Sequence, residues 1–227
     1  MIVGDGLIAK AFSKKYENDN SVIIFASGVS NSEENNPSNF TRERNLLLHF
    51  LHKYPNLKFV YFSTILIDYK HNPYYTHKKE MEDLIKSNLN DYIIVRVPQL
   101  IGMTGNDNNL IKYLITNIKN GVTIDLYDDV KRALLDVDDL VKFIDYCKDL
   151  STRKSISVGG VEPISVVDLS KKIGYILNMK PIIKIKVKNE DDGWTKISDD
   201  TFNNFLIISK IKSEGYTEKI IKKYVKI

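Results

Sequence analysis

The feature that most constrains this chain is the alternation of short apolar runs with amphipathic stretches along its 227 residues. The apolar runs are almost continuous, as expected of strands buried on both faces of a sheet. The stretches between them place apolar residues three and four apart, as one face of a helix does. This alternation predicts an α/β fold in which helices cover a parallel sheet. The expected strands are residues 1–3, 22–26, 58–63, 92–97 and 155–158.

Several amphipathic stretches are expected to form helices. They are residues 7–16, 39–53, 74–86, 109–119, 137–149, 165–177 and 217–224. Asp136 and Ser165 stand at two of the expected starts, where a side-chain oxygen can accept a hydrogen bond from a free main-chain N–H group. No internal repeat or low-complexity linker divides the chain, so we expect a single domain over residues 1–227.

The net charge of +4 comes from 33 basic and 29 acidic residues that are interleaved along the chain. Lysines gather only in residues 219–226, at a spacing typical of the solvated face of a helix. A nucleic-acid-binding protein would concentrate basic residues in a stripe or patch. We therefore expect no nucleic-acid partner.

Cys147 is the single cysteine, so no disulfide can form within the chain. No apolar run approaches the ~20 residues that span a bilayer. The N-terminal residues do not have the basic and then apolar pattern of a signal peptide. We expect a cytoplasmic protein that does not enter a membrane.

Gly4, Gly6 and Ala9 fit the pattern G-x-G-x-x-G/A directly after the first expected strand and at the start of the first expected helix. Glycines in such a turn allow a tight bend and the close approach of a pyrophosphate to the main chain. Free N–H groups at the helix start, including those of Leu7 and Ile8, and the positive end of the helix dipole favour that anion. The turn predicts a dinucleotide site, although two glycines between a strand and a helix can also serve packing alone.

The same pattern usually has an acidic residue ~20 residues further on, at the end of the second strand, where it binds the adenosine ribose. Residues 22–26 lie at this distance, and no acidic residue ends this strand. The segment therefore resembles the fourth strand of a dinucleotide-binding fold better than the second.

Tyr74 and Lys78 are four residues apart at the start of an expected helix, directly after Pro73. This spacing puts both side chains on one face. An ammonium group there can lower the pKa of the phenol, so that the tyrosine can exchange a proton with an alcohol or a ketone. Tyr75 and Lys79 have the same spacing, and a pair on a helix surface is the simpler alternative. An expected strand just upstream leads to Thr64, which carries a hydroxyl, and this favours a catalytic role for Tyr74 and Lys78.

Together with these residues, the order of several segments resembles the extended short-chain dehydrogenase/reductase family, whose members are nucleotide-sugar epimerases, dehydratases and ketoreductases. The matching segments are residues 24–30, Asn45, and residues 94–102, 132–139 and 157–166. The resemblance covers nearly the whole chain. It implies a Rossmann-like, doubly wound parallel sheet with a small C-terminal substrate-binding region.

The resemblance also implies roles for individual residues. Thr64 would bind the reacting oxygen, Tyr74 would be the acid/base, and Lys78 would hold the nicotinamide ribose and lower the tyrosine pKa. Arg132 would contact the diphosphate of a nucleotide-linked sugar, with a surface salt bridge to Asp128 or Asp129 as its simpler role. The implied cofactor contacts are Gly4, Gly6, Leu7, Ile8, Ala26, Ser27, Gly28, Asn45, Lys78 and Pro98, and the implied substrate contacts are Thr64, Gln99 and Arg132.

The chain also departs from the family pattern. The first expected helix leads straight to residue 22, so the sheet should lack the two strands that normally lie beyond the first. That removes the usual adenosine contacts and leaves the choice between NAD and NADP open. Residues 100–135 and 160–227 are expected to form a small substrate-binding cap. A second subunit could pair across the exposed first strand and form a homodimer.

These features favour an enzyme that reduces a 4-keto (6-deoxy) sugar nucleotide with NAD(P)H. A nucleotide-sugar 4-epimerase is the alternative within the same chemistry, and a non-catalytic nucleotide-binding or regulatory module is the alternative from another class. A 4,6-dehydratase is disfavoured because Ile65 and Leu66 follow Thr64 where those enzymes carry Asp and Glu. No metal site is expected, since His49 and His52 on one helix, even with Glu43, lack a further ligand at a suitable spacing.

Overall fold

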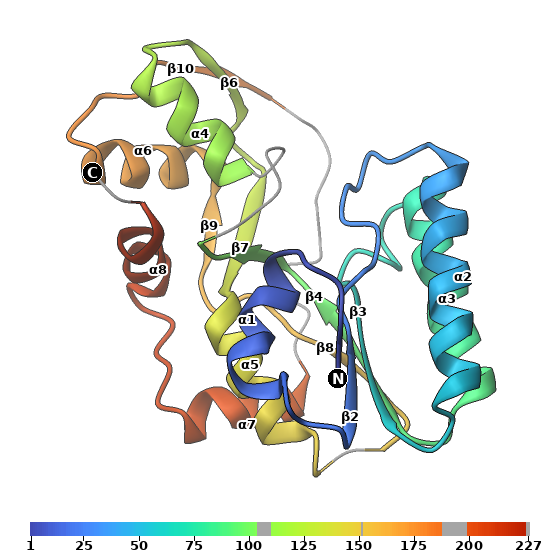
Figure 1. Ribbon diagram of the computed structural model, residues 1–227. Helices are drawn as coiled ribbons and strands as arrows, with labels where there is room; N and C mark the ends of the chain where they lie inside the picture. Colours follow the sequence, from blue (N-terminus) through green and yellow to red (C-terminus); the bar gives the residue numbers. More distant parts are fainter. Residues whose placement is uncertain (104–109, 151, 188–198, 226–227) are drawn as a thin grey trace.

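A computed structural model describes residues 1–103, 110–150, 152–187 and 199–225. At its centre lies a five-stranded sheet in which every neighbouring pair of strands is parallel (Figure 1). In spatial order the strands are β1 (Ile2–Val3), β2 (Val22–Phe25), β3 (Lys58–Thr64), β4 (Tyr92–Val97) and β8 (Lys154–Ser157). The predicted parallel α/β sheet is confirmed, and within the described residues β1 pairs with β2 alone, as expected for a sheet without strands beyond the first.

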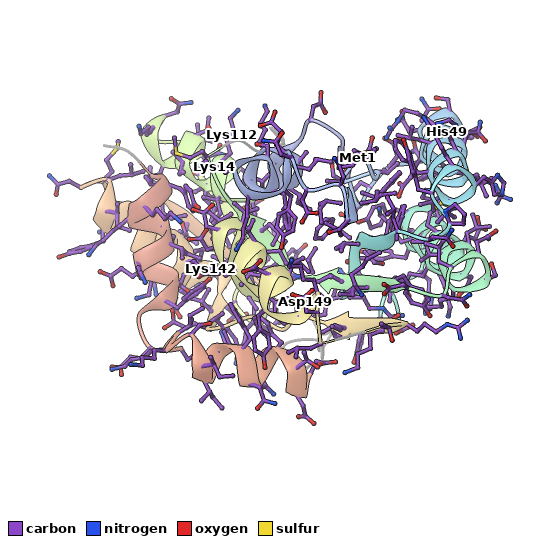
Figure 2. The ribbon with its side chains drawn as sticks, turned by 60° about the horizontal axis from the view of Figure 1, so that its bottom comes forward. Met1, Lys14, His49, Lys112, Lys142 and Asp149 are labelled. Atoms are coloured by element: carbon purple, nitrogen blue, oxygen red, sulfur yellow. The ribbon has the colours of Figure 1, made fainter. Side chains whose placement is uncertain are left out.

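Helices cover both faces of this sheet. They are α1 (Leu7–Tyr16) and α5 (Val137–Cys147) on one face, and α2 (Pro37–Lys53) and α3 (Pro73–Asn88) on the other. Side chains alternate between the two layers along a strand, so Ile24 of β2 packs with Phe12 of α1, while its neighbour Phe25 packs with Leu47 of α2. Figure 2 shows the same division, with Lys14 on α1 and Lys142 on α5 far from His49 on α2.

The connection from β1 to β2 has an unusual hand. The β2–α2–β3 and β3–α3–β4 connections step across the sheet in one direction over one face. The β1–α1–β2 connection steps in the same direction, but α1 lies on the opposite face. Its hand is therefore opposite to that of the other two. Because about 98% of such parallel connections are right-handed, we infer that β1–α1–β2 is left-handed. The longer connection from β4 to β8, which contains α5, also crosses the α1 face.

The remaining elements gather beside the carboxyl ends of the central strands and along the α1/α5 side (Figure 1). Two small sheets order them as β5–β7–β9 and β6–β10. Their strands are β5 (Gln99–Ile101), β6 (Ile124–Tyr127), β7 (Lys131–Asp136), β9 (Pro163–Ser165) and β10 (Ile183–Lys186). Their helices are α4 (Leu110–Lys119), α6 (Val166–Ile176), α7 (Asp200–Ile208) and α8 (Tyr216–Tyr224). The sequence did not predict these short strands or α7.

Both predicted helix starts are confirmed. The Asp136 carboxylate accepts the Asp138 N–H at 2.9 Å at the start of α5, and the Ser165 hydroxyl accepts the Asp168 N–H at 2.9 Å at the start of α6. Asp136 also accepts a hydrogen bond from the Tyr224 hydroxyl at 2.6 Å, which fastens α8 to this corner. Among the described helices, none is both long enough and apolar enough to cross a bilayer.

Candidate active site

Four parallel strands end at the same edge of the sheet and bring the predicted site segments together. The glycine turn follows β1, residues 26–28 follow β2, Thr64 ends β3, and Pro98 follows β4. In open α/β sheets the carboxyl ends of the strands are where ligands bind. The residues at this edge are therefore the candidates for a ligand site.

The two glycines of the first turn serve different purposes. Gly4 has a φ of +123°, and a Cβ there would lie 2.5 Å from the Ala26 carbonyl oxygen, so packing against the end of β2 excludes a side chain. Gly6 begins α1 with an extended backbone and no side-chain hydrogen bond to cap the helix. A Cβ at Gly6 would meet nothing within 4 Å. The start of α1 is thus open to an approaching anion, which fits the pyrophosphate of a dinucleotide.

Leu7 and Ile8 can serve such a site through their main-chain N–H groups, which have no partner within the helix. The side chain of Leu7 is directed into packing, since a Cβ at Gly102 would lie 2.4 Å from Leu7 Cδ1. Both side chains are half-buried.

The Lys78 ammonium lies in a buried cluster beside the end of β2. Its Nζ donates hydrogen bonds to Glu43 Oε1 and to the Tyr61 hydroxyl, each at 3.1 Å. A Cβ at Gly28 would lie 2.6 Å from this Nζ, so the ammonium rests against the glycine main chain. Residue 28, the third after β2, must therefore be small for Lys78 to occupy this position. Ser27, next to it, accepts hydrogen bonds from Arg42 at 3.1 and 3.0 Å.

Glu43 is the centre of this cluster and has no exposed surface. Its Oε1 accepts a hydrogen bond from the Tyr61 hydroxyl at 2.6 Å, in addition to that from Lys78. Its Oε2 accepts the Val29 N–H at 2.6 Å and lies 3.1 Å from His77 Nε2. Burial alone would raise the pKa of this carboxyl, but Lys78, His77, Tyr61 and the Val29 N–H together lower it to about 2.

Tyr74 lies beside this cluster and is 7% exposed. Its ring packs edge-on against Tyr75 at 5.0 Å and lies 5.9 Å from Lys78 Nζ. Burial, Tyr75 and Glu43 raise the pKa of the Tyr74 hydroxyl above its ordinary value. Lys78 does not offset this increase in the Tyr74 pKa, because its charge is paired with Glu43 and burial dominates.

The second tyrosine–lysine pair, Tyr75 and Lys79, lies in a different environment. Lys79 is exposed, and its Nζ lies 4.0 Å from Asp68 Oδ1. Tyr75 is buried, and its pKa is raised by burial and by Glu33 although Arg132 opposes the shift. The pair with both members buried is Tyr74 and Lys78, which favours the register chosen from the sequence.

Thr64 is half-buried at the end of β3, and its Oγ1 accepts the Leu66 N–H at 3.3 Å. The residues after it are apolar, with Ile65 and Leu66 packed against Ala133 of β7. Where sugar dehydratases carry two acidic residues, this chain therefore presents a hydrophobic contact.

Arg96 ties the segment between Thr64 and Tyr74 to the rest of the site. Its guanidinium donates to Asp68 in that segment at 2.7 Å. It also donates to both carboxylate oxygens of Glu82 on α3, at 2.9 and 2.8 Å. The Glu82 side chain is fully buried. One strand residue thus fixes both the connection and the helix that carries Tyr74.

Two of the predicted substrate residues, Gln99 and Arg132, lie on the neighbouring small sheet, next to the predicted cofactor contact Pro98. Pro98 is buried between β4 and β5, and Gln99 of β5 pairs with Leu134 of β7. Arg132 is half-buried on β7, near enough to Tyr75 to affect its pKa, and its Nη1 donates to the Lys131 carbonyl oxygen at 2.8 Å.

Asn45 is not brought to this site. It is exposed on α2, whereas the buried side of that helix carries Glu43, Leu47 and Leu51. Two residues along a helix correspond to a rotation of roughly 200°, so Asn45 faces away from the side on which Glu43 contacts Lys78. The sequence prediction for Asn45 is corrected accordingly. The missed residue is Glu43, whose signal was its place four residues before Leu47 on the apolar stripe.

His49 and His52 are exposed on α2, away from the buried Glu43. Among the described residues, no group of three or more His, Cys, Asp or Glu side chains is arranged to hold a metal ion.

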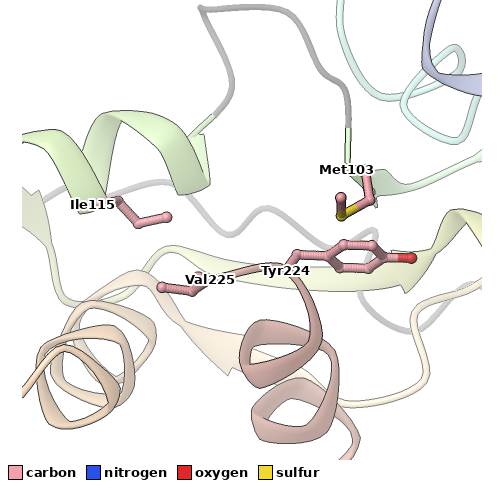
Figure 3. A pocket seen from close by; sticks show the side chains of 4 residues that line it. All are labelled: Met103, Ile115, Tyr224 and Val225. Carbon is pink, nitrogen blue, oxygen red and sulfur yellow. The ribbon is translucent and has the colours of Figure 1, made fainter. Parts of the chain in front are cut away.

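A separate cavity of about 350 Å³ lies between α4, α8 and the end of β5. Its lining is mainly apolar and consists of Met103, Ile115, Tyr224 and Val225 (Figure 3). The Tyr224 ring faces Met103 in this view, and its hydroxyl is occupied by the hydrogen bond to Asp136. The cavity therefore offers apolar contact rather than charge.

Comparison with solved structures finds the same fold in larger enzymes. A dTDP-glucose 4,6-dehydratase from Bacillus anthracis str. Ames, in complex with NAD, superposes with a TM-score of 0.71 at 18% identity, over 95% of this chain and 74% of that one. A UDP-N-acetylglucosamine 4-epimerase from Methanobrevibacter ruminantium M1, in complex with UDP-N-acetylmuramic acid, gives 0.69 at 18% identity, over 97% and 78%. The RMD protein of Pseudomonas aeruginosa, complexed with NADPH, gives 0.67 at 16% identity, over 89% and 79%.

Curated protein sequences gave no match to this chain. A family model does match: that of the NAD dependent epimerase/dehydratase family, over residues 8–159. The matched segment runs from the first helix to the end of β8 and includes Thr64, Tyr74 and Lys78. On this match and on the fold, the chain belongs to the NAD-dependent epimerase/dehydratase family.

Proposed function

We propose that this protein is an NAD(P)H-dependent reductase of a 4-keto (6-deoxy) sugar nucleotide. The observation that carries the proposal is the state of Tyr74. Its side chain is buried at the carboxyl edge of the sheet with the ring 5.9 Å from Lys78 Nζ, and the pKa of its hydroxyl is raised above the ordinary value. A phenol that remains protonated at neutral pH is suited to give a proton to a carbonyl oxygen as that carbonyl is reduced.

In this proposal each of four residues has a separate role in catalysis or binding. Tyr74 Oη gives its proton to the sugar oxygen and regains one from solvent after the reaction. Thr64 Oγ1, at the end of β3, binds the same oxygen and orients the carbonyl. Lys78 holds the ribose next to the nicotinamide. Arg132, on the adjoining β7, binds the diphosphate of the substrate, for which a guanidinium has suitable planar geometry.

The Gly4–Gly6 turn and the start of α1 would hold the cofactor's pyrophosphate, because Gly6 leaves open space in front of free N–H groups. A bound nicotinamide would supply the hydride that reduces the carbonyl carbon. Two of the similar structures contain NAD and NADPH, respectively. No acidic residue ends β2, so the chain offers no indication of a preference for the 2′-hydroxyl of NAD.

We also propose that residues 100–135 and 160–227 form the substrate-binding cap. They supply α4, α6, α8 and the two small sheets, which gather beside the carboxyl edge that holds Thr64 and Tyr74 (Figure 1). The apolar cavity lined by Met103 and Tyr224 lies within this cap and could accept an uncharged part of the substrate.

A 4-epimerase is the second candidate, because one of the similar structures is a nucleotide-sugar 4-epimerase. The same Tyr74 would first accept the proton from the sugar hydroxyl and then return it. An epimerase must retain its cofactor through both half-reactions. The two-residue edge strand β1, with no strand beyond it among the described residues, favours the reductase, which releases the cofactor after each turnover.

The proposal is tested with NADH, NADPH and a panel of 4-keto-6-deoxy sugar nucleotides. A reductase oxidises one cofactor for each sugar reduced, whereas an epimerase changes the configuration at C4 without net oxidation. Tyr74→Phe should abolish turnover and leave cofactor binding within a few-fold of wild type. Tyr75→Phe, the neighbouring phenol in the other register, is the matched control and should retain most activity. Failure of both nicotinamides to bind at millimolar concentration would favour a non-catalytic module.

A further inference from the structure

An exposed arginine at the carboxyl edge of the sheet has no role in the proposed function. α2 begins at this edge (Figure 1), and Arg42 lies in the second turn of the helix. Its Nη1 donates to the Ser27 hydroxyl at 3.1 Å, and its Nη2 donates to the Ser27 carbonyl oxygen at 3.0 Å. These two hydrogen bonds fix the guanidinium on one residue of the loop that follows β2.

Ser27 lies against the glycine turn. The Ala26 N–H donates to the Val3 carbonyl oxygen at 2.8 Å, which aligns the end of β2 with the end of β1. A Cβ at Gly4 would lie 3.0 Å from the Ser27 main-chain nitrogen. Among the described residues, the Ser27 N–H has no acceptor, so it is a further donor at this place. Through Ser27, the guanidinium is therefore held beside the turn that leads into α1.

The positive charge of Arg42 is not neutralised by a carboxylate. Within the described part of the chain the arginine forms no ion pair, and its hydrogen bonds go to neutral oxygens. Glu34, before it in the chain, accepts the Asn36 N–H at 2.9 Å. Glu43, directly after it, is turned inward to Lys78. Because a guanidinium has more N–H donors than Ser27 uses, it can bind an anion without breaking these hydrogen bonds.

The glycine turn needs such a charge to bind a dinucleotide. Asp5, between Gly4 and Gly6, is exposed and places a carboxylate at the turn. The start of a helix contributes only about half a positive charge. Together they do not compensate the dianionic pyrophosphate that would lie there. A cationic side chain is therefore required, and Arg42 is held at this place.

We propose that Arg42 is a cofactor-binding residue, whose guanidinium, held by Ser27, binds the pyrophosphate of the nicotinamide dinucleotide. The start of α1 faces the same anion from the other helix layer. The inference deepens the proposed function and rests on its nicotinamide cofactor. A guanidinium suits phosphate oxygens because it presents several N–H donors in one plane. Since NAD and NADP both contain the pyrophosphate, Arg42 strengthens the binding of both and does not select between them.

The experiment measures cofactor affinity rather than turnover. Fluorescence titration gives the Kd of NADH and of NADPH for wild type and for Arg42→Gln. The variant should bind both about tenfold more weakly, the low end for a hydrogen bond between charged groups, because the guanidinium is exposed. Arg42→Lys keeps the charge without the planar set of donors and should lose less. Urea unfolding should not distinguish these variants from wild type, since an exposed side chain contributes little to stability.

Arg44→Gln is the matched control. Arg44 is also exposed on α2, and two residues along a helix correspond to a rotation of roughly 200°, so it faces away from Ser27. Its replacement removes the same charge and should leave both Kd values unchanged. Salt screens an exposed charge, so raising the ionic strength from about 0.05 to about 0.5 M should reduce the difference between wild type and Arg42→Gln.

Several results would overturn the proposal. If Arg42→Gln binds both cofactors as tightly as wild type, Arg42 only secures the loop after β2. If the binding of NADPH alone is weakened, the guanidinium contacts the 2′-phosphate and not the pyrophosphate. If Arg44→Gln weakens binding equally, the effect is one of overall charge.

The proposed reductase and this inference fail in different ways. Arg42-dependent binding of both cofactors, in a protein that reduces no 4-keto sugar nucleotide, would refute the reductase and support the inference. Absence of binding to wild type at millimolar concentration would refute the inference together with the cofactor assignment.

Discussion

Replacing Gly6 by alanine should weaken dinucleotide binding while leaving the fold intact. The backbone at Gly6 has a φ of −76° and a ψ of −166°, which alanine adopts without strain, and its new Cβ would meet nothing within 4 Å. The loss of a favourable helix cap and the gain from a stiffer unfolded chain are both below about 1 kcal/mol and of opposite sign. The unfolding free energy should therefore change by less than about 1 kcal/mol.

The same methyl group would occupy the space through which a pyrophosphate reaches the start of α1. Displacing the anion from one main-chain N–H group removes a charge-assisted hydrogen bond of about 1.5–3 kcal/mol. That corresponds to about tenfold to about 150-fold weaker binding. Fluorescence titration with NADH and NADPH measures the affinity, and urea unfolding measures the stability.

Gly4→Ala is the contrasting variant. Its φ of +123° and the 2.5 Å approach of a new Cβ to the Ala26 carbonyl oxygen set main chain against main chain, so no flexible side chain can yield. Backbone strain and displacement of the β2 end should together cost about 2–6 kcal/mol. If Gly6→Ala binds NADH as tightly as wild type, the pyrophosphate does not sit at this turn. If Gly4→Ala is as stable as wild type, the packing argument is wrong.

Two other changes probe the buried charges. The pKa of Glu43 is lowered to about 2 in the folded protein from 4.5, so its contribution to stability is complete above pH 4.5 and is lost as the pH falls towards 2. Urea unfolding at a series of pH values should show this loss, of about 3 kcal/mol, and Glu43→Gln should flatten the dependence. Arg96→Met leaves Glu82 buried with only Lys86 as a cation and should cost about 3 kcal/mol, part of which the double variant Arg96→Met/Glu82→Gln recovers. A loss below about 1 kcal/mol in Arg96→Met would show that Glu82 is solvated or neutral.

The central sheet could be predicted from sequence because its strands are buried on both faces. β1 to β4 are short, almost continuous apolar runs, whereas β8 has polar residues at three of its four positions. The observed strands differ from the predicted ones by at most one residue at either end. The small strands could not be predicted in this way. β6 alternates buried and exposed residues over only four positions, and β10 is mostly exposed. Their pairing is decided by contacts with α4 and α6 that no local pattern records.

α7 was missed for a related reason. Of its nine residues, only Phe202 and Phe205 are buried, and they pack against Phe143 of α5. Two apolar contacts three residues apart are too few to define a helical period. Ile207 and Ile208 of the same helix are exposed, which further obscures the pattern.

The site was predictable where it depends on spacing along one helix and not where it depends on two. Tyr74 and Lys78 are four residues apart, and the structure buries them together. The partner of Lys78 lies 35 residues away on α2. A resemblance to the family suggested Asn45 for that helix, while the side that faces the site is set by the burial of Leu47 and its neighbours. The signal in the sequence for Glu43 was a carboxylate among the apolar residues on the buried side of α2.

The left-handed β1–α1–β2 connection means that further strands could be added to the sheet on the outer side of β1. Because α1 lies on the α5 face, a strand placed on the outer side of β1 would follow α1 in the right-handed sense. A strand–helix–strand segment inserted between Tyr16 and Val22 would therefore extend the sheet without moving any existing element, provided that its return to β2 crosses the α2 face. Such a graft could carry an acidic residue for the adenosine ribose. Engineered variants of this kind would allow the choice between NAD and NADP to be tested directly.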